Sequence, residues 1–224
     1  MIEINNITSA GTIKVSFRRI ALAKIGLFGG TFDPPHLGHL ISAQTIVDHL
    51  ALDKMIFIPA GRPPHKCHQI ISHADRRLKM VQLAIADNPQ FEVSDWELHQ
   101  TGPAYTILTI EHFSSAFPNN SLFWIIGADS LADLPTWREF RRLIESINIV
   151  TAWRGGVDIE KVLNNLARTL DPAHFEKLKK NLVRTPMIEL SATEIRQKVR
   201  QGHSIRYRVP PAVEQYIINE GLYR

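Results

Sequence analysis

The segment GGTFDPPHLGHL (residues 29–40) decides the fold expected for this chain of 224 residues. An apolar run around Leu27 precedes it, and the glycine pair at its start ends that run. Two prolines at its centre form a corner, after which the apolar spacing becomes helical. The segment therefore predicts a buried strand, a tight turn and the first turn of a helix.

Two histidines, His36 and His39, lie three residues apart at this expected helix start. Residues at positions i and i+3 share a helix face, so the two imidazoles should project together. Pro35 suits the first helical position, because its φ is fixed near the helical value and its missing N–H costs nothing there. Backbone N–H groups and the helix dipole favour anions at such a start, and Gly38 lets a ligand approach between the rings. The pattern predicts a phosphate pocket lined by two imidazoles.

Apolar strand-like runs alternate with helical stretches along the rest of the chain. Strands are expected at 24–28, 54–59, 91–93, 121–126, 147–152 and 186–188. Helices are expected at 37–50, 75–87, 105–116, 137–145, 158–168, 173–182, 192–200 and 211–219. This alternation predicts an α/β fold, a parallel sheet with helices on both faces. Ligands of such sheets sit beyond the carboxyl ends of the strands, where Gly29, Pro59 and Gly127 are found.

The composition, 44% hydrophobic and 21% charged, is that of an ordinary globular protein. We expect an N-terminal extension at residues 1–22, partly disordered, and one domain over residues 23–224. The net charge of +4 suits anionic small substrates, and no long basic stripe favours nucleic acid. No apolar run is long enough to span a bilayer, so no membrane partner is expected. Cys67 is the only cysteine, which favours a reducing cytoplasm.

The segment 29–40 resembles the HxGH signature of the nucleotidyltransferase superfamily, whose members transfer a nucleoside monophosphate from a triphosphate. From about Lys24 to the C-terminus, the sequence is similar to the family of bacterial nicotinate-nucleotide adenylyltransferases. The supporting segments are RPPHK at 62–66, GPAYT at 102–106, WIIGADSL at 124–131, PTW at 135–137, LSATEIR at 190–196 and EGLY at 220–223. The resemblance implies a Rossmann-like fold of the nucleotidyltransferase type. It also implies ATP and nicotinate mononucleotide as substrates, with deamido-NAD and pyrophosphate as products, in NAD biosynthesis.

Adenylyl transfer needs positioning and charge stabilisation more than covalent chemistry, because a phosphate is already a competent nucleophile. The resemblance makes His36 and His39 the catalytic pair, which would donate N–H bonds to phosphate oxygens. The alternative is a pair of helix-capping or metal-binding histidines, but a third ligand at helical spacing is absent. Mg²⁺ is expected to arrive with ATP and needs few protein ligands, so no protein metal site is predicted. The ATP-binding residues implied around the pair are Gly29, Gly30, Thr31, Phe32 and Gly38.

LSATEIR at 190–196 is the second phosphate element that the resemblance implies, for the β- and γ-phosphates of ATP. Ser191 or Thr193 would cap the helix at 192–200, and Arg196 follows one turn later. An ordinary helix cap with a solvent-facing arginine is the alternative. The segment has Ala192 where the family commonly has a second serine.

RPPHK at 62–66 follows an expected strand on a proline-rich loop, and Lys66 is its expected contact to a substrate phosphate. Arg62 and His65 are weaker candidates. A zinc site built from His65, Cys67 and His68 is the alternative, but their spacing fits no recognised structural zinc pattern.

Tyr105, Thr106 and Trp137 are the implied contacts to nicotinate mononucleotide. Trp137 offers an aromatic face to the pyridine ring, and the helix start at Thr106 offers donors to its carboxylate. Core packing is the alternative for Tyr105 and Trp137. The chain departs from the family pattern where serine, aspartate and tryptophan are common, at Ala104, Leu108 and Phe140.

Two charged residues complete the expected site. Asp129 follows the strand at 121–126 and is placed to bind ribose hydroxyls, with a helix N-cap as the alternative role. Arg154 follows the strand at 147–152 and is a candidate partner for the mononucleotide phosphate, or simply an exposed arginine.

The sequence is compatible with other functions. Nicotinamide mononucleotide or phosphopantetheine would be alternative acceptors, although adenylyltransferases for phosphopantetheine usually have threonine where this chain has His36. A non-catalytic nucleotide sensor on the same fold is the third hypothesis, because fold alone does not fix function. Assembly into a homo-oligomer is left open.

Overall fold

The computed structural model of this chain describes residues 22–62 and 71–224. The expected extension at 1–22 therefore lies outside the described residues except for Leu22, and so does Lys66. Within the described ranges, no helix is long and apolar enough to cross a membrane.

Six parallel strands form the sheet of the described chain, in the order β3-β2-β1-β4-β5-β6. Their bounds are β1 Lys24–Gly30, β2 Lys54–Pro59, β3 Phe91–Val93, β4 Ser121–Gly127, β5 Asn148–Trp153 and β6 Leu182–Arg184. The chain first builds outward from β1 to β3, then returns to place β4 on the other side of β1. This reversal creates a topological switch point between β1 and β4, where such sheets bind their ligands.

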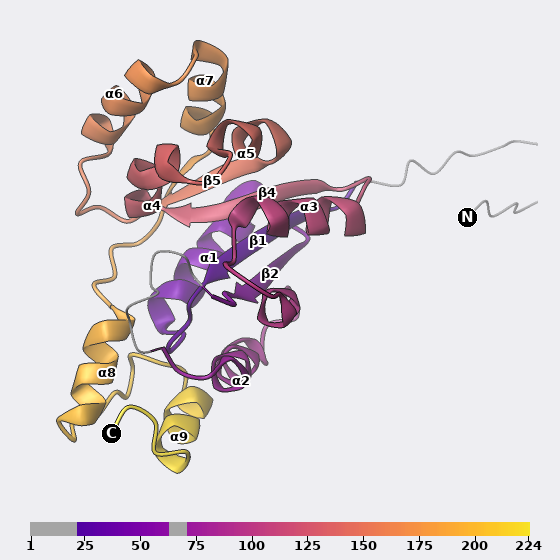
Figure 1. Cartoon of the computed structure of the whole chain (residues 1–224). Coiled ribbons are helices and arrows are strands. Elements are labelled where there is room, and N and C mark those ends of the chain that lie inside the picture. Colours follow the sequence, from indigo (N-terminus) through magenta and orange to yellow (C-terminus); the bar gives the residue numbers. More distant parts are fainter. Residues whose placement is uncertain (1–21, 63–70) are drawn as a thin grey trace, which may run out of the picture.

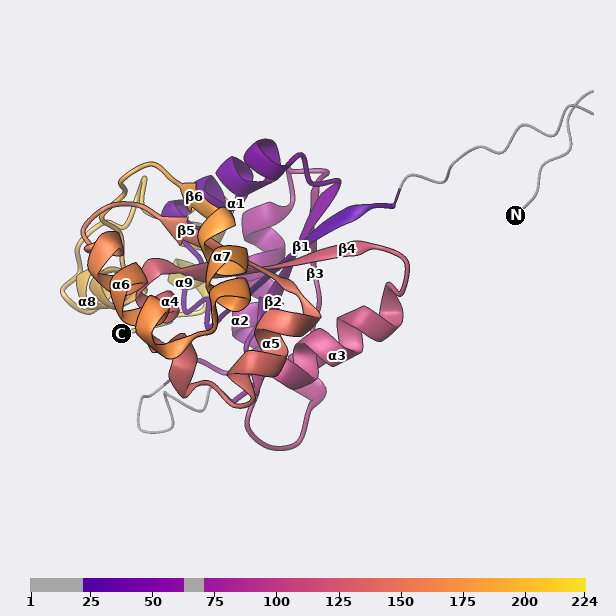
Figure 2. The same cartoon turned by 90° about the horizontal axis from the view of Figure 1, so that it is seen from above.

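Helices cover both faces of the sheet (Figures 1 and 2). One layer is formed by α1 Leu37–Leu50, α2 Ala74–Ile85, α8 Ala192–Arg200 and α9 Pro211–Asn219. The other is formed by α3 Thr106–Ala116, α4 Ala128–Asp133, α5 Phe140–Ser146, α6 Ile159–Thr169 and α7 Pro172–Lys180. The predicted α/β fold, Rossmann-like with helices on both faces, is confirmed.

The central strands are apolar on both sides because each layer buries one side of them. Along β2, Met55 and Phe57 pack in the layer of α1 and α2, while Ile56 and Ile58 pack in the layer of α3. Alternate residues of a strand point to opposite faces, so a strand covered twice reads as a continuous apolar run. That continuous pattern is why this strand was predicted with its bounds correct.

The sixth strand differs from the prediction. A strand was expected at 186–188 and a helix at 173–182, but α7 ends at Lys180 and β6 covers Leu182–Arg184. The pairing of β6 with β5 starts at Leu182, and the last ladder bond runs from the Thr185 N–H to the Trp153 carbonyl at 2.8 Å. Pro186 has no N–H to continue it, which explains why the strand stops there.

Short elements were also missed. Helix α4 and the 3₁₀ turns η2 (Trp96–His99) and η3 (Leu134–Thr136) were not predicted. They span three to six residues, too few to show a helical repeat.

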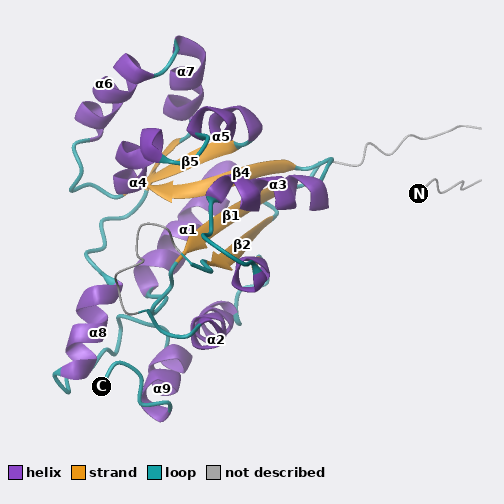
Figure 3. Ribbon diagram, viewed as in Figure 1, coloured by secondary structure: helices purple, strands orange, loops and turns teal. Residues whose placement is uncertain are grey.

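Figure 3 shows the loops at the carboxyl ends of the strands, where the connections from β4 and β5 leave the sheet.

We expect Gly29→Ala to destabilise the fold. A Cβ at Gly29 would lie 2.7 Å from Cη2 of Trp124, whose side chain is buried in the core. Overpacking of this kind costs about 1–3 kcal/mol of unfolding free energy. Gly127→Ala is the matched control, because a Cβ there meets no atom within 4 Å. Urea unfolding of both variants tests this, and equal midpoints would contradict it.

Candidate active site

A cavity of about 390 Å³ opens at the switch point, beyond the carboxyl ends of β1, β4 and β5. A second cavity of about 380 Å³ adjoins it and shares Asp129, Arg154 and Ser191 with it. Together they have the size of a nucleotide site. The lining of the first comes from the β1–α1 connection, the start of α4, the end of β5 and the start of α8.

The two histidines stand together at the cavity, as predicted. Their rings are stacked, with centroids 3.7 Å apart and planes 22° from parallel. The backbone N–H of His36 donates to Nδ1 of His39 at 3.2 Å, so a neutral His39 carries its proton on Nε2. Phe32 meets the His39 ring edge-on at 5.2 Å and fixes its plane. His39 is therefore oriented as an N–H donor.

His36 is held neutral by its surroundings. It is only 5% exposed, and burial, with the nearby Arg154 charge as a second cause, lowers its pKa to about 4. Its Nδ1 has no hydrogen-bond partner among the described residues. Gly38 makes room for this ring, because a Cβ there would lie 3.1 Å from Nδ1 of His36. At neutral pH, His36 thus contributes a neutral imidazole.

Helix α1 begins at Leu37, as predicted, and His36 is its N-cap. Pro35, whose fixed φ suits a first helical position, lies immediately before the N-cap instead. The Leu37 N–H donates to the carbonyl of Arg208 at 2.9 Å, and the His39 N–H to the carbonyl of His36 at 2.9 Å. Two N–H groups that were expected to face an anion are therefore already bonded within the chain.

The start of α8 supplies the cationic side of the cavity. Of the two predicted caps, Ser191 is the N-cap, and its hydroxyl accepts from the Glu194 N–H at 3.1 Å. Arg196 lies one turn along and lines the cavity. Its guanidinium donates to the Asp33 carbonyl at 2.8 Å and to the Thr193 hydroxyl at 3.4 Å. These bonds hold a permanent positive charge beside the histidines.

Asp129 and Arg154 line both cavities and are exposed to them. The N-cap of α4 is Gly127, so the alternative role of Asp129 as the helix cap is wrong. Arg154 donates to the carbonyl of Ile188 at 3.4 Å, which links the end of β5 to the segment before α8. The two side chains offer the cavity one carboxylate and one cation.

Several predicted residues lie elsewhere. Of the ATP-binding residues implied near the histidines, Gly29 and Gly30 do not line the cavity, whereas Thr31, Phe32 and Gly38 do. A Cβ on Gly30 would lie 2.8 Å from the Phe32 ring. These two glycines serve close packing beneath the site. Lys66 lies outside the described residues.

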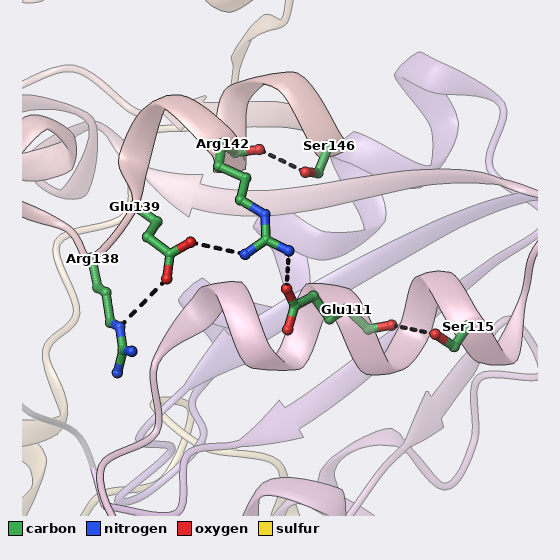
Figure 4. A network of polar contacts seen from close by, with 6 residues as sticks. All are labelled: Glu111, Ser115, Arg138, Glu139, Arg142 and Ser146. Carbon is green, nitrogen blue, oxygen red and sulfur yellow. Dashed lines mark hydrogen bonds and ion pairs between the residues drawn. The ribbon is translucent and has the colours of Figure 1, made fainter.

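The predicted nicotinate contacts form a separate group on the α3–α5 side. Tyr105 and Trp137 are partly buried against the core of that layer and, like Thr106, do not line the cavity. The guanidinium of Arg138 covers the Tyr105 ring at 4.7 Å. Figure 4 shows Arg138, Glu139, Arg142 and Glu111 joined in one polar network that ties α5 to α3 next to these residues.

Two buried cavity residues were not selected from the sequence. Asp33 is 3% exposed and Thr185 is 4% exposed, and both line the cavity. Asp33 lies within the segment GGTFDPPHLGHL (29–40), so its position beside the histidines could have marked it as a cavity residue. Nothing in the local pattern marks Thr185, since it reaches the cavity only through the pairing of β6 with β5. No group of three metal-binding side chains occurs in residues 22–62 and 71–224.

We expect His36 to make the fold less stable as pH falls. Its pKa is about 4 when folded, against 6.5 ordinarily, so the unfolded chain takes up a proton first. The contribution of neutral His36 to the free energy of unfolding is complete above about pH 6.5, and about 2 kcal/mol of it is lost by pH 5. Urea unfolding at both pH values should show a smaller loss in His36→Gln, while His203→Gln, at an exposed position, should match the wild type. An unchanged loss in His36→Gln would contradict this.

Comparison with known proteins places this chain in a family. The cytidylyltransferase-like family matches residues 27–198. A probable nicotinate-nucleotide adenylyltransferase from Thermomicrobium roseum is 40% identical over 203 residues, covering 91% of this chain and 92% of that protein. One from Thermus thermophilus is 42% identical over 201 residues, covering 90% of this chain and 100% of that protein.

Among solved structures, Plasmodium falciparum nicotinic acid mononucleotide adenylyltransferase complexed with NaAD has a similar fold, with a TM-score of 0.71 at 19% identity. The match covers 90% of this chain and 97% of that one. The sequence relatives, which match at about twice that identity over nearly their whole length, decide the family. The chain belongs to the nicotinate-nucleotide adenylyltransferases, within the cytidylyltransferase-like family.

Proposed function

We propose that this protein transfers AMP from ATP to nicotinate mononucleotide, giving deamido-NAD and pyrophosphate, as a step of NAD biosynthesis. The observation that carries the proposal is the stacked histidine pair at a cavity that Arg196 also lines. This arrangement suits a phosphate chain, because imidazole N–H groups and a guanidinium are donors to phosphate oxygens. The names of the relatives support nicotinate mononucleotide as the acceptor.

In the proposed reaction, a phosphate oxygen of the mononucleotide attacks the α-phosphorus of ATP. A new P–O bond forms to the α-phosphorus, while the bond from this phosphorus to the oxygen that bridges the α- and β-phosphates breaks. Pyrophosphate leaves with the electron pair of the broken bond. His39 donates its Nε2–H to a phosphate oxygen on which charge develops. His36 packs against His39 and fixes its direction, while Arg196 and Arg154 offset the negative charge. Preorganised donors of this kind carry most of such a reaction's acceleration.

We propose that Mg²⁺ accompanies ATP. The described carboxylates that line the cavity are Asp33 and Asp129, and both oxygens of Asp33 are bonded within the chain. Asp129 is thus the one of the two with oxygens to offer, which fits an ion held mainly by phosphates and water. When bound, the ion would neutralise phosphate charge.

The acceptor site is proposed from the resemblance. Trp137 would stack on the pyridine ring, and Tyr105 and Thr106 would lie near its carboxylate, with Lys66 and Arg154 at the phosphate. Tyr105 lies against Arg138, next to the ion pairs that join α5 to α3, which supports a binding site for the pyridine ring on these two helices. We place the reaction in the cytoplasm, in keeping with a single cysteine, and expect no nucleic-acid partner.

Activity is tested with purified protein, ATP and Mg²⁺, and either the acid or the amide mononucleotide. We expect pyrophosphate release with nicotinate mononucleotide and a lower kcat/KM with nicotinamide mononucleotide. A higher kcat/KM for the amide would show that nicotinamide mononucleotide is the preferred acceptor and would contradict the proposal. ATP binding without pyrophosphate release would instead favour the nucleotide sensor.

The role of His39 is tested by two substitutions that separate its ring nitrogens. Asn places an oxygen near the position of Nδ1, so His39→Asn keeps an acceptor for the His36 N–H but loses the donor at Nε2. Gln reaches farther, and His39→Gln retains a donor near that position. We expect kcat to fall about 10²–10³-fold in His39→Asn and less in His39→Gln, with little change in ATP affinity. Equal kcat values in both variants would remove the Nε2 donor from the mechanism.

A further inference from the structure

The last residues of the chain reach the turn that carries the active site. After α9, Gly221 and Tyr223 adopt positive φ values of 59° and 67°, and the Leu222 N–H bonds back to the Ile217 carbonyl at 3.0 Å. Leu222 is buried in the core of this layer, and Tyr223 packs against the same core. The Tyr223 hydroxyl donates to Oδ1 of Asp33 at 2.6 Å, across 190 residues of sequence.

Asp33 is held at three points. Its Oδ1 accepts from Tyr223, and its Oδ2 accepts from the Ser72 N–H at 3.0 Å. Its backbone carbonyl accepts from the Arg196 guanidinium at 2.8 Å. The carboxylate is buried, so it depends on these donors, because a buried charge lacks the hydrogen bonds of water.

A buried cation on α2, Arg77, also binds this turn. Arg77 is 2% exposed, and its guanidinium donates to the carbonyls of Thr31 and Ser72, each at 3.0 Å. Burial lowers the pKa of Arg77, and the neighbouring Asp33 charge opposes that shift. With Arg77 bound to carbonyls, the Tyr223 hydroxyl is the side-chain donor that binds the Asp33 carboxylate.

Arg196 donates to the backbone carbonyl of Asp33 rather than to its carboxylate. An arginine prefers a carboxylate as a partner, since charge-assisted bonds are about twice as strong as neutral ones. With Tyr223 and Ser72 on its two oxygens, the carboxylate has less to offer the guanidinium, which remains on the cavity wall. Removal of the tyrosine hydroxyl would leave the buried carboxylate short of one donor, in the residue whose carbonyl binds the Arg196 guanidinium.

We propose that Tyr223 is a positioning residue, whose hydroxyl occupies the Asp33 carboxylate and thereby keeps Arg196 directed at the triphosphate of ATP. The proposal rests on the proposed function only in taking ATP as the ligand of Arg196. It assigns a role to the closing EGLY segment, which lies far along the chain from the histidine motif.

Tyr223→Phe tests this in the full-length protein, with ATP affinity measured directly by calorimetry in the presence of Mg²⁺. The variant keeps the ring that packs against the core, so it should fold, and circular dichroism verifies this. We expect the Kd for ATP to rise about five- to tenfold, which is up to about 1.4 kcal/mol. Tyr216→Phe is the matched control, because Tyr216 on α9 packs against the same core and makes no bond to Asp33. Its ATP affinity should equal that of the wild type.

A double-mutant cycle distinguishes positioning from a general loss of stability. If Tyr223 acts through Arg196, Tyr223→Phe should add nothing to the loss of ATP affinity in an Arg196→Ala background. Equal losses in both backgrounds, or unchanged affinity in the single variant, would overturn the proposal. Turnover by the wild type decides the proposed function separately, since the cycle reads ATP binding and needs no acceptor.

Discussion

The central position of β1 is the constraint on which the site depends. Parallel pairing with β2 on one side and β4 on the other fixes the position of the β1 backbone from Ile25 to Phe28. The connection that leaves this strand must therefore emerge at the switch point, and it carries Thr31, Asp33 and the histidine pair with it. Parallel sheets present their ligand sites at this edge because successive crossovers leave in opposite directions there.

Below that edge, buried polar groups join the two helical layers. Glu97 accepts from the Thr109 hydroxyl of α3 at 2.6 Å and from the Gly61 N–H at 3.4 Å. Arg77 of α2 donates to the carbonyls of Thr31 and Ser72 and, at 3.5 Å, to the carbonyl of the same Gly61. Burial raises the pKa of Glu97, against the opposing effect of the Thr109 hydroxyl. Such groups cost free energy unless they are bonded, so they specify one arrangement of the loops around the cavity.

Sequence reasoning succeeded where the signal was local. The helix at 37–50 and the strand at 54–59 have their predicted bounds, because the first shows a helical repeat of apolar residues and the second a continuous apolar run. The proximity of the His36 and His39 rings was predicted from their spacing at the start of this helix. Helix α4 was too short to show a period, and β6 was placed four residues too late because its pairing with β5 is a contact between distant segments.

The parts of the site that depend on tertiary structure were not accessible in this way. No local pattern predicts that the Leu37 N–H bonds to Arg208, or that Tyr223 meets Asp33. The resemblance implies Gly29 and Gly30 as ATP-binding residues, yet the space that a Cβ would need at these positions is filled by the rings of Trp124 and Phe32. Residue types identified the chemistry, whereas packing between distant segments decided which groups still face the cavity.

The cavity wall is divided between the two layers of helices. His39 and Arg196 belong to the layer of α1 and α8, whereas Asp129 and Arg154 extend from the side of α4 and the end of β5. A nucleotide that contacts all four would act as a cross-link between the two layers, in addition to the sheet and the hydrogen bonds that already join them. Its binding should therefore slow hydrogen exchange in α8 and α4 together, although these helices lie on opposite faces.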